Sequence, residues 1–121
     1  MPVYIVAQFR ITDHGRFRHY DTAMRSILPR FGGEEIVSSN DLDIFAGQPN
    51  VNHVAVIRFP DEARAKTFTE SPEYQMTSVL REAGAEMTAV LLRSHEVNHG
   101  SAQPTAPETL APLFRPGEPA A

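Results

Sequence analysis

The segment SPEYQMTSVLR, residues 71–81, carries the signals of a helix that begins at its first residue. Ser71 can cap the helix, and Pro72 suits the first helical position, where its missing N–H is not needed. Glu73 adds negative charge in the first turn, which favours the positive end of the helix dipole. The sequence therefore predicts a helix that starts abruptly at Ser71.

The preceding segment, FPDEARAKTF at residues 59–68, contains a second helix start. A strand-like run ends at its Phe-Pro pair, and Asp61 can cap a short helix that ends near Glu70. Two helical pieces are thus predicted to meet at the start of SPEYQ, with Phe68 and Tyr74 on either side of the break. A broken helix beside a sheet can form the wall of a pocket.

Alternation of apolar and polar residues predicts four strands, at residues 3–11, 34–38, 53–59 and 87–93. A helix is predicted from about His14 to Arg30, with regular hydrogen bonding ending near Pro29. Residues 42–46 are predicted to resume extended structure, as one bent strand or a small hairpin with residues 34–38. In the second of the two helical pieces, apolar residues recur at the spacing of one helix face, at Met76, Val79 or Leu80, and Ala83.

The order of these elements is β-α-β-β-α-β, the layout of an α+β, ferredoxin-like fold with one antiparallel sheet. The helices are expected on one face of that sheet. The other face is expected to carry mostly apolar side chains, namely Tyr4, Val6, Val54, Val56, Thr88, Val90 and Leu92, beside Gln8 and Arg58. Such a face is too apolar to leave in water, so a second copy is expected to cover it and form a homodimer.

Composition narrows the classes of partner. The chain has 121 residues, a formal net charge of -4 and no basic cluster, which argues against nucleic acid or an anionic membrane. It has no cysteine, so disulfides and thiolate chemistry are excluded. No apolar run is long enough to span a membrane and no signal-peptide layout is present, so a cytoplasmic protein is expected.

The sequence changes character after the last predicted strand. Five of the ten prolines lie at positions 104–119, among Gly, Ala, Ser and Thr. We therefore expect a folded domain over residues 1–94 and a flexible or extended Pro-rich tail over residues 95–121.

Three motifs give the chain a resemblance to a known family. FGG at residues 31–33, the strand that ends in Phe59-Pro60, and SPEYQ followed by Arg81 resemble domain of unknown function 1330. That family belongs to the dimeric α/β-barrel superfamily, so the resemblance implies a ferredoxin-like fold paired into a barrel over residues 3–93. Relatives in the superfamily include cofactor-independent monooxygenases, lactone isomerases, polyketide cyclases and haem-handling proteins, so fold is a poor guide to function.

Two positions depart from the pattern of that family. Arg58 stands where the family usually has Glu, and Phe68 stands where it usually has Trp. Arg58 would favour an anionic ligand or an internal ion pair, for which Glu35 is one partner. Phe68 keeps an aromatic wall but lacks the indole donor.

The best candidates for chemistry lie on the predicted helix-side pocket. His53 could act there as general acid or base, and the Tyr20 hydroxyl could polarise a substrate carbonyl. The plainer readings are a strand-end histidine and a core aromatic residue. The substrate-binding residues are expected to be Phe17, Phe68, Tyr74, Arg58 and Arg81, although Arg81 in a surface ion pair with Glu73 or Glu82 is the plainer reading.

HEVNH at residues 95–99 matches a zinc-site pattern. It directly follows a strand, and Gly100 would cut any helix short, so a chance match is favoured and no metal site is expected.

Three functions fit these features. The first is a small cofactor-independent isomerase, cyclase or monooxygenase that acts on a hydrophobic, oxygen-bearing small molecule. The second is a non-catalytic binding or stress-associated dimer that uses the same pocket. The third is a haem-binding protein in which His53 or His19 ligates iron.

Overall fold

The computed structural model describes residues 1–95 and contains four strands, three α-helices and one 3-10 helix. In chain order they are β1 (Val3–Ile11), α1 (His14–Ile27), η1 (Leu28–Phe31), β2 (Glu34–Ser39), β3 (His53–Phe59), α2 (Glu62–Glu70), α3 (Pro72–Gly84) and β4 (Ala85–Arg93). One compact unit comprises Met1–Leu42 and Asn50–Ser94, while Asp43–Pro49 belongs to a second unit. The predicted Pro-rich tail and most of the HEVNH match lie outside the described residues.

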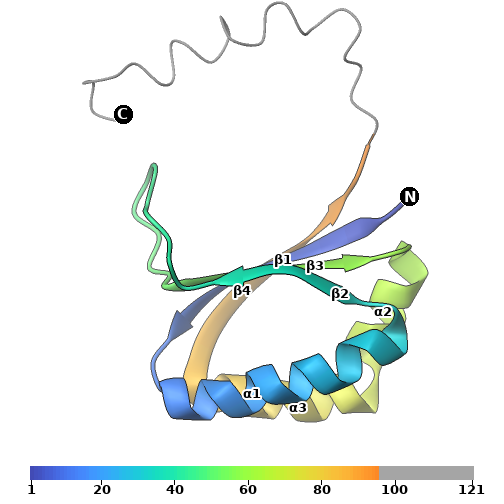
Figure 1. Ribbon diagram of the computed structural model, residues 1–121, viewed down its shortest axis with the longest axis horizontal. Coiled ribbons are helices and arrows are strands. Elements are labelled where there is room, and N and C mark those ends of the chain that lie inside the picture. The colour runs from blue at the N-terminus through green and yellow to red at the C-terminus, as the bar shows by residue number, and fades with distance from the viewer. Residues whose placement is uncertain (96–121) are drawn as a thin grey trace, which may run out of the picture. The chain divides into compact units, whose positions relative to one another are not determined.

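The strands form one antiparallel sheet in the order β2-β3-β1-β4. The helices all lie on one face of it (Figure 1), which confirms the predicted ferredoxin-like layout. Alternate residues of β1 and β3 point toward the helices, and the buried core includes Val3, Ala7, Phe9, Ala55, Ile57 and Phe59. The core therefore sits between the sheet and the helix layer.

The break between α2 and α3 is held by Ser71, which caps both helices. Its hydroxyl donates to the Phe68 carbonyl at 2.7 Å and accepts from the Tyr74 amide at 3.1 Å. The Ser71 backbone is extended, with φ -71° and ψ 148°, so the chain leaves one helix and enters the next within a single residue. The side chain is buried and both of its polar roles are filled, which fixes the angle of the break.

Residues 42–46 form no strand, so the prediction of a bent strand or hairpin there is wrong. After β2 the Ser39 hydroxyl accepts a hydrogen bond from the Asp41 amide at 2.9 Å. This local bond turns the chain away from the ladder, as short polar residues commonly do.

The buried face of α3 also differs from the prediction. Met76, Val79 and Leu80 are 75%, 64% and 39% exposed, whereas Thr77 and Gly84 are buried. The helix is rotated because Gly84 lies directly against the backbone of α1, where only a residue without a side chain fits. Apolar spacing therefore identified the helix but not the side that faces the core.

The sheet face opposite the helices, here called the outer face, carries the predicted apolar row. Val6 lies between Val56 on β3 and Val90 on β4, and Tyr4 lies between Arg58 and Leu92. Val90 and Leu92 are 62% and 53% exposed in the single chain. No described residue of the chain's helices covers this face (Figure 1).

Candidate functional site

An apolar hollow, here called the central cavity, has a volume of about 250 Å³ and lies between the sheet and all three α-helices. Its floor is formed by side chains of β1, β3 and β4, among them Ile5, Ile57 and Leu91. Tyr20 of α1, Phe68 of α2 and Tyr74 of α3 line the side formed by the helices. The broken helix thus forms the wall of this cavity, because the residues flanking Ser71 both reach it.

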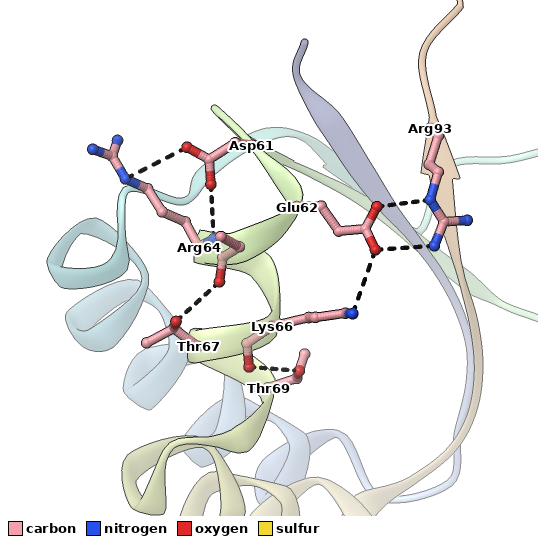
Figure 2. A network of polar contacts seen from close by, with 8 residues as sticks. Asp61, Glu62, Arg64, Lys66, Thr67, Thr69 and Arg93 are labelled. Atoms are coloured by element: carbon pink, nitrogen blue, oxygen red, sulfur yellow. Dashed lines mark hydrogen bonds and ion pairs between the residues drawn. The ribbon is translucent and has the colours of Figure 1, made fainter.

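Polar groups on this cavity are few. The lining residues that carry a polar group are Tyr20 and Tyr74, together with Thr69 and Lys66 of α2. Figure 2 shows that Lys66 turns toward Glu62, at 3.7 Å, while Arg93 of β4 makes two hydrogen bonds to the same carboxylate, at 2.7 and 3.0 Å. The Arg93 hydrogen bonds hold the pKa of Glu62 below its usual range. These contacts fix the start of α2 against the end of β4.

The Tyr74 hydroxyl is oriented by Arg81, two helical turns later on the same face of α3. Arg81 Nη1 donates to Tyr74 Oη at 2.8 Å. The Arg81 side chain is only 13% exposed, and its contact with the Glu82 carboxylate is longer, at 3.7 Å. Glu73, the other predicted partner, pairs instead with Arg30 at 3.2 Å. Because Arg81 fills an acceptor position on Tyr74, the proton of that hydroxyl remains available for an acceptor on a ligand.

The Tyr20 hydroxyl is the second donor and belongs to a side chain that is 6% exposed. Burial raises the pKa of Tyr20 well above its ordinary value, Tyr74 adds to the rise, and Arg81 opposes it. Tyr20 is therefore a neutral hydrogen-bond donor across the physiological pH range rather than a phenolate base.

His53 and Phe17 do not line the central cavity; they lie on a second hollow between α1 and β2, here called the polar groove. This groove has a volume of about 430 Å³ and is also lined by Asp21, Glu35 and Ser38. The structure thus divides the single predicted pocket into two. Tyr20, Phe68 and Tyr74 share one hollow, and Phe17 and His53 share the other.

The His53 ring is fixed within its surroundings. Its Nε2 lies 2.9 Å from the Ser38 hydroxyl, and the ring packs edge-on against Phe9 and Phe17, with centroids 5.6 and 5.4 Å away. Its Nδ1 is buried without a hydrogen-bond partner in the described part of the chain. Burial lowers the pKa of His53, while Asp21 opposes that shift.

Asp21 was not singled out from the sequence, and Glu35 was considered only as an ion-pair partner of Arg58. Glu35 points to the helix side because it lies opposite Ile57, whereas the neighbouring Glu34 lies opposite Arg58. Burial raises the pKa of Glu35, and the nearby Asp21 adds to the rise. Strand alternation could have placed Glu35 on the helix side, but no local pattern links it to Asp21 on a different element.

Arg58 lies on the outer face and does not reach the central cavity. Its guanidinium is 3.9 Å from the Glu34 carboxylate, so the predicted pairing with Glu35 is wrong. The error follows from register, because the side chains of paired residues lie on the same face of a sheet.

Residues 1–95 contain no group of three or more His, Asp or Glu side chains arranged to hold a metal ion. Of the HEVNH match, only His95 lies in this range. His19, one of the proposed haem ligands, is exposed on α1, whereas His53 lies in the polar groove. No helix in the same range is long and apolar enough to cross a membrane.

Comparison with solved structures shows the same fold in several proteins. A protein of unknown function from Rhodopseudomonas palustris is 15% identical, with TM-score 0.66 and coverage of 79% of this chain and 84% of that chain. A dimeric ferredoxin-like protein of unknown function from Jannaschia sp. CCS1 is 16% identical, with TM-score 0.64 and coverage of 78% and 100%. SnoaB, a cofactor-independent oxygenase from Streptomyces nogalater, is 11% identical, with TM-score 0.59 and coverage of 80% and 96%.

At these identities the solved structures establish the fold alone. No match was found among curated proteins. The family model of domain of unknown function 1330 matches residues 2–95, which is nearly the whole described range. The protein therefore belongs to the domain of unknown function 1330 (DUF1330) family.

Proposed function

We propose that the protein is a small cofactor-independent enzyme, of the isomerase, cyclase or monooxygenase type, whose substrate is a hydrophobic, oxygen-bearing small molecule. The observation that carries the proposal is the central cavity, an apolar space of about 250 Å³ whose lining includes Tyr20 and Tyr74. An apolar pocket with a few fixed donors is the usual form of a small-molecule site. The fold shared with a cofactor-independent oxygenase is compatible with this class.

The two tyrosines suit a carbonyl oxygen. Each can donate one hydrogen bond, and Arg81 draws electron density from the Tyr74 hydroxyl that it contacts. When a proton leaves the carbon next to the carbonyl, negative charge develops on that oxygen and both donors stabilise it. This enolisation step is shared by isomerisation, cyclisation and reaction of a substrate carbanion with oxygen. Phe68 would pack against the ring of the substrate.

A binding-only function is the second candidate, and one observation favours it. Among the described residues that line the central cavity there is no carboxylate and no imidazole. A protein that binds the same molecule without turning it over needs neither group.

Selective binding of a ketone tests the proposal. We expect 2-tetralone to bind about 10-fold more tightly than tetralin, which has the same rings without the oxygen, because one or two hydrogen bonds are each worth roughly 1 kcal/mol. Tyr20→Phe should reduce this ratio several-fold, and so should Tyr74→Phe. Titration calorimetry measures both affinities.

Tyr4→Phe is the matched control, since Tyr4 lies on the outer face. It should leave the ratio unchanged. Equal affinity of the wild type for the two compounds would contradict the proposal. Exchange of the ketone's α-hydrogens in D₂O, followed by NMR, separates the enzyme from the binding-only protein, which would bind without accelerating exchange.

We further propose that two copies pair through the outer face to form a dimeric α/β barrel. The apolar row centred on Val6, Val56 and Val90 gives this face its affinity for a second copy. Solved neighbours that are described as dimeric ferredoxin-like proteins support the arrangement.

Sedimentation at micromolar concentration should give twice the chain mass of 13.4 kDa. Val56→Glu should convert the protein to a monomer, because a charge would be buried without a partner in the interface. Met76→Glu, on the exposed side of α3, should leave the mass unchanged. A wild-type monomer, or a dimer broken only by Met76→Glu, would exclude this interface.

A further inference from the structure

A third hollow, here called the small cavity, lies between the central cavity and the polar groove. Its volume is about 20 Å³, enough for a single water molecule. It shares Tyr20 with the central cavity, and it shares Asp21, Glu35, Ser38 and His53 with the polar groove. The small cavity is therefore walled by residues that also line the two larger hollows.

The walls of the small cavity are suited to hold a water molecule. His53 Nδ1 is buried and has no hydrogen-bond partner within residues 1–95, while Nε2 is engaged by Ser38 at 2.9 Å. A buried ring nitrogen without a partner is costly, and a bridging water is the common way to satisfy it. Such a water would also have Glu35 and Tyr20 on the walls around it.

Glu35 is the acidic group best placed to give up a proton here. Asp21 is tied to Arg25 at 3.0 Å, whereas no ion pair joins Glu35 to a cation among the described residues. Burial and the neighbouring Asp21 raise the pKa of Glu35 and Arg25 opposes the rise only in part, so Glu35 keeps its proton to higher pH than an ordinary glutamate. Burial raises the pKa of the Tyr20 hydroxyl most, and Asp21 and Glu35 add to the rise, as expected for acidic groups that lie close to it.

We propose that Glu35 supplies, through a water held by His53 in the small cavity, the proton that Tyr20 gives to the substrate oxygen in the central cavity. This inference rests on the proposed function and adds an acid that the central cavity itself lacks. Glu35 is the proton donor of the relay, and His53 is a positioning residue that holds the water.

The proton transfers balance as follows for a ketone. The Tyr20 O–H bond breaks and an O–H bond forms on the substrate oxygen, while the electron pair of the α C–H bond becomes the enol double bond and its proton leaves to solvent water. The Tyr20 oxygen takes a proton from the water in the small cavity, and that water takes one from the Glu35 carboxyl. Glu35 regains its proton from solvent through the polar groove, which is open.

The relay predicts a defined pH dependence. It works while Glu35 is protonated, so the rate should fall as pH rises through the raised pKa of Glu35. The charged and titratable groups that line the groove around Glu35 come from α1 and β3, and they are His14, Arg18, Asp21, Arg25 and His53.

The test follows α-hydrogen exchange of 2-tetralone in D₂O across pH. Glu35→Gln should lower the exchange rate at least about 10-fold and abolish the decrease in rate with rising pH that is assigned to Glu35. It should leave the affinity for 2-tetralone unchanged. Glu34→Gln is the matched control, because its side chain lies on the outer face beside Arg58, and it should behave as the wild type. His53→Gln should lower the rate with the same retained affinity.

A Glu35→Gln variant with the wild-type rate and pH profile would overturn the relay while leaving the proposed function standing. A wild type that does not bind 2-tetralone would instead overturn the proposed function. If Glu35→Gln does not fold, NMR of the wild-type protein tests the relay instead. The ¹⁵N chemical shifts of the His53 ring should change at the pH at which Glu35 titrates. The absence of such a change would exclude the coupling of His53 to Glu35.

Discussion

Phe68→Ala is expected to lower the free energy of unfolding by about 3–5 kcal/mol, the usual cost of removing a buried phenylalanine ring. Phe68 is 1% exposed. Its ring centroid lies 5.6 Å from that of Phe31, 5.4 Å from that of Phe59 and 4.8 Å from that of Tyr74. These contacts join α2 to η1, β3 and α3, so no single neighbour can move in to fill the space.

Urea unfolding followed by circular dichroism measures this loss, with an unchanged denaturant slope showing that the folded state is retained. Met76→Ala is the control on the adjacent helix. Met76 is 75% exposed, so its replacement should change the unfolding free energy by no more than about 0.5 kcal/mol. A loss at Met76 equal to that at Phe68 would mean that α3 presents the opposite side to the core.

Gly84→Ala should destabilise the protein by about 2–3 kcal/mol, even though alanine is the better helix former. A Cβ at Gly84 would lie 2.7 Å from the Phe17 amide nitrogen and 2.9 Å from the Asp13 carbonyl oxygen. Both are backbone atoms at the start of α1 and cannot rotate away. The Gly84 carbonyl also accepts hydrogen bonds from the amides of Thr12 and Asp13, at 2.9 and 3.1 Å, so separating the two helices would lengthen these bonds.

Gly15→Ala provides the matched control, since Gly15 also lies in a helix. Its Cβ would meet only the Asp13 carboxylate, at an ordinary 3.5 Å. This substitution should stabilise the protein by up to about 1 kcal/mol through helix propensity and the less flexible unfolded chain. Thermal unfolding measures the change in melting temperature that each substitution causes. Changes of opposite sign in the two variants would support the close approach of α1 and α3, and changes of the same sign would argue against it.

Most of the fold could be predicted because its signals are local. Ser71 and Pro72 carry their own capping chemistry, and α3 begins at Pro72 as expected. Asp13 and Asp61 likewise cap α1 and α2, because their carboxylates accept hydrogen bonds from the backbone amides three residues later. The strands at residues 3–11 and 53–59 were predicted to the residue because their alternation is regular.

Rotation of a helix about its own axis is a tertiary property, and here the sequence pattern was misleading. The apolar residues Met76 and Val79 suggested one face, but the backbone contact at Gly84 requires another. A glycine near a helix end is typical of a stop signal, so the sequence pattern does not indicate this contact. Because Gly84 has no side chain, α1 and α3 can lie close together at this point.

The candidate site was predictable where side chains come from neighbouring segments. Phe68 and Tyr74 flank one break, and both line the central cavity. His53 and Glu35 share the polar groove only because β2 and β3 pair in a particular register, with a shift between Glu35 and Val37. That register does not follow from either strand alone.

A crystal structure of the protein with 2-tetralone tests the central claim most directly. We predict the ketone between the sheet and the helices, with its oxygen within hydrogen-bond distance of the Tyr20 or Tyr74 hydroxyl and its ring beside Phe68. Ligand density on the outer face or in the polar groove, with the central cavity unchanged, would contradict the assignment of the central cavity as the substrate site.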